Sequence, residues 1–334
     1  MQDTERPFSL VRNLAPGEKA TGFFIIRKKE WKTKKDGTPY LLLELGDVSG
    51  RISATLWENV QQAGEEFRPG DTVKVLGTVM EFNDARQISI ERIRKTEGKD
   101  GILPKDFLRT GAIDPDALFF SLMETIARTG NSAIRNLLER MFSDPVLQER
   151  FKEAPGGKLW HHAYLGGLLE HTLSVVSICD ALCRLYPDLD RDLVTAGAIL
   201  HDIGKTEEYR WDQGFIDYSD EGRLWGHIAI GAQKVKAEIE KIEASEGFPA
   251  ELKRPLLHLI LSHQGKLEQG SPVLPMTREA VALYYADEID SKQNALSHII
   301  ERDREPGKNW SKYIQLLDRF IYMGDGDAKS KDQK

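Results

Sequence analysis

The stretch Leu200-His201-Asp202-Ile203-Gly204-Lys205 constrains the chain more than any other. It places a histidine and an aspartate side by side at the end of an apolar run that begins at Leu193. The run is typical of a buried helix, with Gly204 as its stop signal. A buried charge is costly unless it is paired or holds a metal. Adjacent helix positions point about 100° apart, so one ligand must be wide enough to reach both side chains. A metal ion meets that need, although a His-Asp pair alone is more often structural.

Further side chains of metal-ligating type occupy inward-facing or helix-end positions in other predicted helices. His171 lies three residues after Leu168 and four before Val175, which places it on an apolar helix face. The others are His227 at the start of a helix, His263 at the end of one, and Asp287 four residues after Leu283. Together with the His-Asp pair, we interpret them as one metal site. Its histidines favour Mn, Fe, Zn or Co over Mg or Ca, which prefer oxygen ligands.

The order H…HD…H…H…D resembles the HD-domain metal-dependent phosphohydrolases over residues 159–297. The resemblance implies a first ion held by His171, His201, Asp202 and Asp287, and a second held by Asp202, His227 and His263. A site of one or two ions would lower the pKa of bound water and supply a hydroxide that attacks phosphorus. Lys205 matches a lysine of that family and would neutralise a phosphoryl oxygen. The alternative is a lysine at the C-terminal end of a helix, where its charge interacts favourably with the helix dipole.

Several further polar residues near these motifs have more than one interpretation. We interpret His161 and His162 as substrate contacts or packing residues rather than metal ligands. Arg223 is interpreted as lining the entrance by which substrate reaches the site. Asp290, three residues after Asp287, either supports a ligand or assists at the metal. The cysteines, Cys179 and Cys183, are i, i+4 on a helix with apolar neighbours, which favours buried thiols over a metal pair.

Composition bounds the class of protein. A chain of 334 residues predicts two domains. A net charge of −7 argues against a wholly basic nucleic-acid binder, so any such contact is expected to be local. Two cysteines provide no disulfide framework, which fits a reducing cytosol. The sequence has neither an apolar run of about 18 residues nor a signal-peptide pattern at its start. We therefore expect a cytoplasmic protein without a membrane span.

Residues 17–94 read as short strands interrupted by a helix near residues 58–66. Three strands, a helix and two strands predict a five-stranded OB barrel. The fold class is therefore multidomain α and β, with an N-terminal OB-fold β-barrel followed by an all-α HD-domain helical bundle. The predicted boundaries are 12–95 for the barrel, 96–153 for a linker with supporting helices, 154–305 for the HD domain, and 306–334 for a C-terminal helix and disordered tail. That last helix rests on the spacing of Trp310, Tyr313, Leu317 and Phe320.

The predicted connection between the first two strands is basic, with an aromatic residue in its middle. A groove that follows phosphates and stacks bases needs both kinds of side chain. The candidate contacts are Lys28, Lys29, Trp31, Lys32, Lys34 and Lys35, with Phe82 and Arg86 from the last connection. The alternative is a solvated hairpin whose lysines keep an edge soluble. Phe82 and Arg86 are evenly balanced between binding and packing, and Trp57 between core and stacking platform.

An OB module ahead of an HD domain resembles the YhaM-type bacterial 3′–5′ exoribonucleases over nearly the whole chain. The phrases that carry it are residues 161–172, 200–205 and 226–228. The resemblance implies hydrolysis of single-stranded RNA, and also of single-stranded DNA, to nucleoside 5′-monophosphates, with manganese as the metal. One departure is Gln264, where a second histidine is expected.

Two other functions compete with that interpretation. One is a nucleotide or cyclic-nucleotide phosphohydrolase of the HD class with a regulatory OB domain. The other is a non-enzymatic RNA-binding protein with a relic HD fold. The sequence leaves open the natural RNA, the preference for RNA over DNA and whether the chain forms a homo-oligomer.

Overall fold

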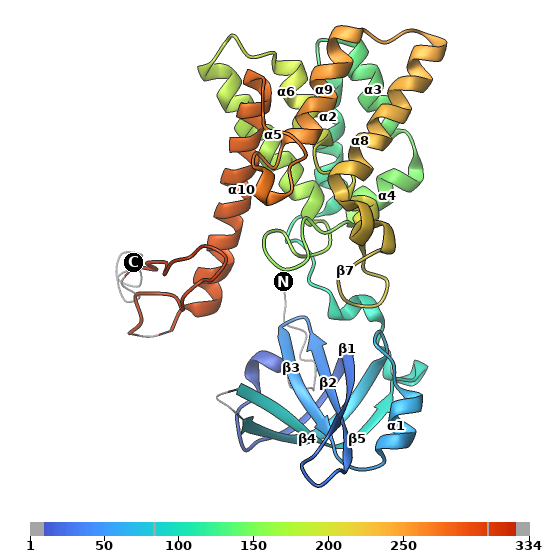
Figure 1. The fold of residues 1–334 in the computed structure, drawn as a ribbon, viewed down its shortest axis with the longest axis vertical. Coiled ribbons are helices and arrows are strands. Elements are labelled where there is room, and N and C mark those ends of the chain that lie inside the picture. Colours follow the sequence, from blue (N-terminus) through green and yellow to red (C-terminus); the bar gives the residue numbers. More distant parts are fainter. Residues whose placement is uncertain (1–9, 83–84, 306, 325–334) are drawn as a thin grey trace. The chain divides into compact units, whose positions relative to one another are not determined.

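The computed structural model describes residues 10–82, 85–305 and 307–324. The chain divides into two compact units (Figure 1). One comprises Met1–Thr110 with Arg210–Asp217, and the other comprises Gly111–Tyr209 with Tyr218–Lys334. The predicted fold class, an OB barrel followed by a helical bundle, is confirmed.

The first unit is a closed barrel with strand order β1-β2-β3-β5-β4. Its elements are β1 (Lys19–Thr33), β2 (Pro39–Asp47), β3 (Gly50–Leu56), α1 (Val60–Glu66), β4 (Thr72–Phe82) and β5 (Ala85–Lys95), with the short helices η1 (Val11–Asn13), η2 (Gly98–Asp100) and η3 (Pro104–Phe107). Alternate residues of the strands, such as Phe24, Leu43 and Val75, point into a common apolar core. β1 runs to Thr33, so most of the basic stretch is strand rather than the predicted loop, and the turn is short.

The barrel unit also takes in a segment that lies far along the chain. Residues 210–217 fall between the HD pair and His227 in sequence, yet Phe215 packs with Ile25 and Phe107 in a small apolar cluster. Gly214 has a positive φ of 76°, and a Cβ there would lie 2.7 Å from the carbonyl oxygen of Pro104. The close approach therefore requires glycine. No apolar periodicity in residues 210–217 predicts that they join the barrel.

The second unit is a bundle of helices (Figure 1). Its helices are α2 (Pro115–Ala127), α3 (Ser132–Phe142), α4 (Pro145–Glu153), α5 (Gly167–Leu185), α6 (Arg191–Leu200), α7 (Lys205–Glu208), α8 (Asp220–Ser245), α9 (Ala250–Ser262), η4 (Leu267–Gln269) and α10 (Arg278–Asp303). The short strands β6 (Tyr209–Arg210) and β7 (Asp217–Tyr218) pair with each other at the two ends of the segment 210–217. Asp114 and Asp144 accept backbone N–H bonds at the starts of α2 and α4, each followed by proline, as the Asp-Pro pairs predict. No helix in the described part of the chain is long and apolar enough to cross a membrane.

The predicted C-terminal helix is wrong. Residues 307–324 form a hairpin after α10, with Trp310 opposite Tyr322 and Ile314 opposite Arg319. Aromatic residues at intervals of three and four imitate a helical stripe, but aromatic and β-branched residues also favour extended backbone. The predicted disordered tail, residues 325–334, lies outside the described residues.

Candidate metal centre

His201 and His263 are positioned in the same way, at the ends of apolar helices. α6 ends at Leu200 and α9 at Ser262, so each histidine is the first residue beyond its helix. The Nδ1–H of His201 donates to the carbonyl oxygen of Ala198 at 2.9 Å, and that of His263 donates to Ile260 at 2.7 Å. These bonds satisfy carbonyls that a helix end leaves without partners. They also determine the tautomer, since Nδ1 carries the proton and Nε2 keeps its lone pair.

His171 and His227 are anchored by carboxylates instead. Nδ1 of His171 lies 2.7 Å from Oδ2 of Asp290, and Nδ1 of His227 lies 3.0 Å from Oε1 of Glu208. The same Glu208 oxygen accepts the backbone N–H of His227. A carboxylate behind an imidazole orients the ring and makes its other nitrogen a stronger donor to a metal. In all four rings, Nδ1 is therefore occupied and Nε2 is the nitrogen that can bind a metal.

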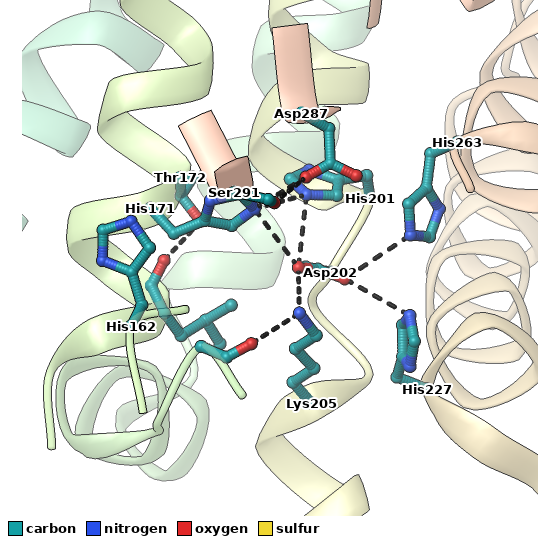
Figure 2. A network of polar contacts seen from close by, with 12 residues as sticks. His162, His171, Thr172, His201, Asp202, Lys205, His227, His263, Asp287 and Ser291 are labelled. Atoms are coloured by element: carbon teal, nitrogen blue, oxygen red, sulfur yellow. Dashed lines mark hydrogen bonds and ion pairs between the residues drawn. The ribbon is translucent and has the colours of Figure 1, made fainter. Parts of the chain in front are cut away.

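The four Nε2 atoms meet at the carboxylate of Asp202 (Figure 2). Oδ2 of Asp202 lies 3.4 Å from His171 Nε2 and 3.3 Å from His201 Nε2. Oδ1 lies 3.4 Å from His227 Nε2 and 3.5 Å from His263 Nε2. Each carboxylate oxygen therefore faces two imidazoles, and the carboxylate stands between two groups of donors.

Asp287 and Lys205 complete the cluster. Oδ1 of Asp287 lies 3.3 Å from His171 Nε2 and accepts the Ser291 hydroxyl at 3.1 Å. The Lys205 ammonium lies 2.6 Å from Asp202 Oδ2 and donates to the carbonyl oxygen of Gly156 at 2.6 Å. Lys205 is buried, which differs from a solvated lysine at a helix end.

The donor set fits divalent cations. Ions with bonds of about 2.1 Å to nitrogen or oxygen hold adjacent ligand atoms roughly 3.0 to 3.4 Å apart, close to the distances around Asp202. Asp202 Oδ1 and His227 Nε2 are buried without a hydrogen-bond partner, which is costly unless an ion takes that place. Burial lowers the pKa of His263, which favours the neutral form that binds metal. Burial opposes ionisation of Asp202, but Lys205 and His201 hold its pKa well below the usual range.

Two glycines bring the halves of the cluster together. At Gly204, a Cβ would lie 2.0 Å from the carbonyl oxygen of His227, so only glycine lets α7 begin this close to α8. Gly204 has helical dihedrals, and α6 already ends at Leu200, so its predicted role as a stop signal is wrong. Gly226 interrupts α8 with a φ of 73°, which lets His227 begin a new helical segment, as predicted.

Comparisons with known proteins bear on this site. The model of the HD domain matches residues 168–292, and the model of an OB-fold nucleic acid binding domain matches residues 25–96. The 3′-5′ exoribonuclease YhaM of Bacillus subtilis is 33% identical over 306 residues, which cover 92% of this chain and 95% of that protein. YhaM of Shouchella clausii is 33% identical over 314 residues, with 93% and 95% covered. This chain belongs to the YhaM family. Its HD domain implies divalent metal binding, for which the cluster supplies the donors.

In this YhaM-family chain, further polar residues surround the cluster. His162 is buried, and its Nε2 lies 2.8 Å from the Asp290 oxygen that also contacts His171. Its Nδ1 meets the Tyr164 hydroxyl, and its backbone N–H donates to Asn294. Asp290 thus contacts the ring nitrogen of His171 that is not the one beside Asp202, which favours the supporting role over assistance at the metal.

His161, Gln264 and Arg223 differ in how closely they approach the cluster. The His161 ring centroid lies 5.6 Å from that of His171, and its buried Nδ1 has no hydrogen-bond partner. Burial lowers the pKa of His161 to about 3, and Lys205 adds to the effect. The Gln264 amide lies 3.3 Å from His263 Nε2. Arg223 is exposed and stacks over the Tyr218 ring at 5.5 Å.

Glu208 is the supporting residue that sequence reasoning missed. It is buried and follows Lys205 by three residues, but an acidic residue beside another, Glu207, reads as an ordinary solvated pair. Ser291 was also missed because a serine one residue after Asp290 carries no signal of its own. Their roles follow from partners that lie elsewhere in the chain.

Two of the residues predicted to contact nucleic acid instead make hydrogen bonds that stabilise the fold of the barrel. The Lys29 ammonium donates to the carbonyl oxygens of Gly64 and Phe67, both at 2.6 Å, at the C-terminal end of α1. Arg86 donates to the carbonyl oxygen of Leu14 at 2.6 Å, which favours the packing alternative for this residue.

The other candidates leave side chains at the barrel surface. Lys34 lies over the Trp57 ring at 4.6 Å, and Tyr40 contacts the same ring at a centroid distance of 4.6 Å. Trp57 is 38% exposed, so it is a surface platform rather than core. The remaining exposed candidates are Lys28, Trp31, Lys32, Lys35 and Phe82, of which Trp31 also packs against Gly64 and Lys32 pairs with Glu30.

Proposed function

We propose that this protein is a metal-dependent 3′–5′ exoribonuclease that shortens single-stranded RNA to nucleoside 5′-monophosphates. One observation supports it above the others, namely that each oxygen of the Asp202 carboxylate faces two imidazole Nε2 atoms. That arrangement suits a carboxylate that bridges two cations. The YhaM relatives are named for this activity, and the chain covers nearly all of their length. Single-stranded DNA is a second substrate of the same chemistry.

The proposed ligands form two groups around the bridge. His171, His201, Asp202 and Asp287 would hold one ion, and Asp202, His227 and His263 would hold the other. Manganese is the proposed metal, with iron, cobalt and zinc as alternatives that suit the same donors. When bound, such ions polarise the phosphate and lower the pKa of a water molecule that attacks it.

Lys205 is proposed to assist the reaction directly. An ammonium has three N–H donors, and Asp202 and Gly156 take two of them. The third can meet a non-bridging oxygen of the scissile phosphate and stabilise its growing charge. Hydrolysis then breaks the bond between phosphorus and the 3′ oxygen, which leaves a new 3′ hydroxyl on the shortened RNA.

His161, Gln264 and Arg223 are proposed to contact the terminal nucleotide. His161 has an unpartnered Nδ1 beside the cluster, and the Gln264 amide reaches the face of His263 that carries Nε2. Arg223 offers an exposed guanidinium close in sequence to His227. His162 is proposed to act only through Asp290, which orients His171.

The barrel is proposed to bind the RNA strand with exposed side chains that contact its bases and phosphates. Trp57, Tyr40 and Lys34 form an aromatic and cationic platform of the kind that stacks bases without sequence preference. Lys32 and Lys35 add positive charge near the turn of the β1–β2 hairpin, and Lys28 adds it farther along β1. Phe82, on the β4–β5 hairpin, is 64% exposed and is proposed as a second stacking residue.

The test is a time course with a 5′-labelled single-stranded RNA and manganese, beside a chelator control and the Asp202→Asn variant. A ladder that shrinks from the 3′ end only with metal and only in the wild-type chain supports the proposal. Binding of metal without RNA cleavage, together with turnover of mononucleotides, favours the nucleotide phosphohydrolase instead. Absence of both metal and turnover favours the relic HD fold.

A further inference from the structure

The C-terminal hairpin, residues 307–324, has an aromatic face that its own fold leaves uncovered. Trp310, Tyr313, Phe320 and Tyr322 are each between 49% and 57% exposed. Trp310 stands opposite Tyr322 with ring centroids 5.1 Å apart, and Tyr313 pairs with Phe320 at 5.2 Å. Phe320 and Tyr322 are two residues apart on one arm of the hairpin, where alternate side chains of extended backbone share a face. Their partners therefore join them in one aromatic face.

The opposite face of the hairpin is its buried side. Ser311, Ile314 and Met323 are buried, although none of them is aromatic. The four aromatic residues of the hairpin named above are exposed instead. The backbone N–H of Lys312 donates to the carboxylate of Asp303, the last residue of α10, at 3.0 Å. The hairpin is thus attached to a rigid helix with its aromatic side turned out. An uncovered apolar face of this kind marks a binding surface.

Charge indicates what binds there. Residues 307–324 contain three basic residues, Lys308, Lys312 and Arg319, and one acidic residue, Asp318, so the segment has a net charge of 3 − 1 = +2 in a chain of net charge −7. Two copies of this face would bring positive segments together, which disfavours self-association. Single-stranded RNA supplies phosphates for the basic residues and flat bases for the aromatic rings. We propose that the aromatic face of the C-terminal hairpin is a binding site for single-stranded RNA, which rests on the proposed function.

The position of the hairpin indicates which part of the RNA it meets. Asp287 and Asp303 lie on the same continuous helix, α10, sixteen residues apart. At 1.5 Å per residue the separation is about 24 Å. With the 3′ end at the metal centre, the hairpin therefore contacts nucleotides well upstream of the cleaved bond. Long substrates reach it, whereas a dinucleotide does not.

The experiment measures RNA affinity of the full-length chain in the presence of a chelator, so that no cleavage occurs. The probe is a 5′-labelled oligoadenylate long enough to span both places. Trp310→Leu and Phe320→Leu keep an apolar side chain but remove the flat ring, whereas Trp310→Tyr keeps a ring. We expect each leucine variant to weaken binding about fivefold or more and the tyrosine variant to restore it. Phe120→Leu is the matched control, because Phe120 is an exposed aromatic residue on α2.

The outcomes separate this inference from the proposed function. Wild-type cleavage of RNA, with unaltered affinity in both leucine variants, overturns the inference alone. A change of oligomeric mass in those variants without RNA, and unaltered RNA affinity, assigns the face to self-association instead. A wild-type chain that neither binds nor cleaves RNA overturns both. With metal restored, slower cleavage of the long RNA but unchanged cleavage of a dinucleotide supports the upstream position.

Discussion

The cluster in the helical unit and the platform on the barrel differ in how their polar side chains are held. Around Asp202, three of the four imidazoles are buried and that of His227 is half-buried, and each has its Nδ1 occupied by a carbonyl or carboxylate. On the barrel, Lys34 and Trp57 are partly exposed, and each contacts a neighbouring side chain rather than a network. The first arrangement determines where donor atoms lie before any ligand arrives. The second offers charge and ring faces but leaves the ligand free to shift along them, which suits a strand that is drawn through one nucleotide at a time.

The largest expected effect in this comparison comes from Asp202→Asn. The amide removes one charge and one donor oxygen from the place where both halves of the cluster meet. We expect turnover of RNA to fall at least about a thousandfold. RNA affinity measured in chelator should stay close to wild type, since the barrel is untouched. Turnover within tenfold of wild type would remove Asp202 from the reaction.

A smaller effect is expected when the supports behind the imidazoles are removed. Glu208→Ala frees Nδ1 of His227, and metal affinity should fall about 10- to 100-fold. Calorimetric titration of the metal-free chain with Mn²⁺ measures it directly. Glu207→Ala is the matched control, because that neighbouring carboxylate pairs with Lys234 at the surface. Equal metal affinity in the two variants would mean that the contact between Glu208 and His227 does not support metal binding.

On the barrel, single substitutions should have smaller effects, and the quantity they change is RNA binding. Trp57→Ala should weaken RNA binding about fivefold, near the low end for one stacked base. Lys34→Ala should reduce the dependence of binding on salt, by about 0.7 in the slope of log affinity against log salt concentration. Binding titrations at several salt concentrations separate the two effects. An RNA affinity that neither variant changes would move the RNA away from this platform.

The smallest effect on RNA binding is expected from Lys29→Ala, although Lys29 lies in the same basic stretch. Its ammonium caps α1, so the variant should lose about 1 to 2 kcal/mol of unfolding free energy. Denaturant unfolding measures that loss, with Lys35→Ala as an exposed control. A large loss of RNA affinity with unchanged stability would return Lys29 to the binding surface.

Local patterns in the sequence predicted the parts of the molecule that local forces determine. Alternating strands and Asp-Pro helix starts predicted the barrel and the supporting helices. The position of His171 on an apolar face, and of His201 and His263 at helix ends, predicted the cluster. The residues next to them in sequence define the helix face or helix end on which they lie, so a single sequence is enough to identify them.

The sequence failed where position depends on distant partners. Glu208 meets His227 across 19 residues, and Lys29 meets Gly64 across 35. Neither contact leaves a local pattern. The C-terminal hairpin was mistaken for a helix because Trp310, Tyr313 and Phe320 share helical spacing. The segment at Phe215 joins the barrel through packing with residues more than a hundred positions away.

The central claim is that Asp202 joins two cation positions, and counting bound Mn²⁺ per chain tests it most directly. We predict two ions in the wild-type chain, one in His263→Ala and one in Asp287→Ala, measured by equilibrium dialysis of the metal-free protein. Two ions close enough to share a carboxylate should also give a coupled paramagnetic resonance signal that either variant abolishes. A single ion in the wild-type chain, unaffected by His263→Ala, would contradict the account.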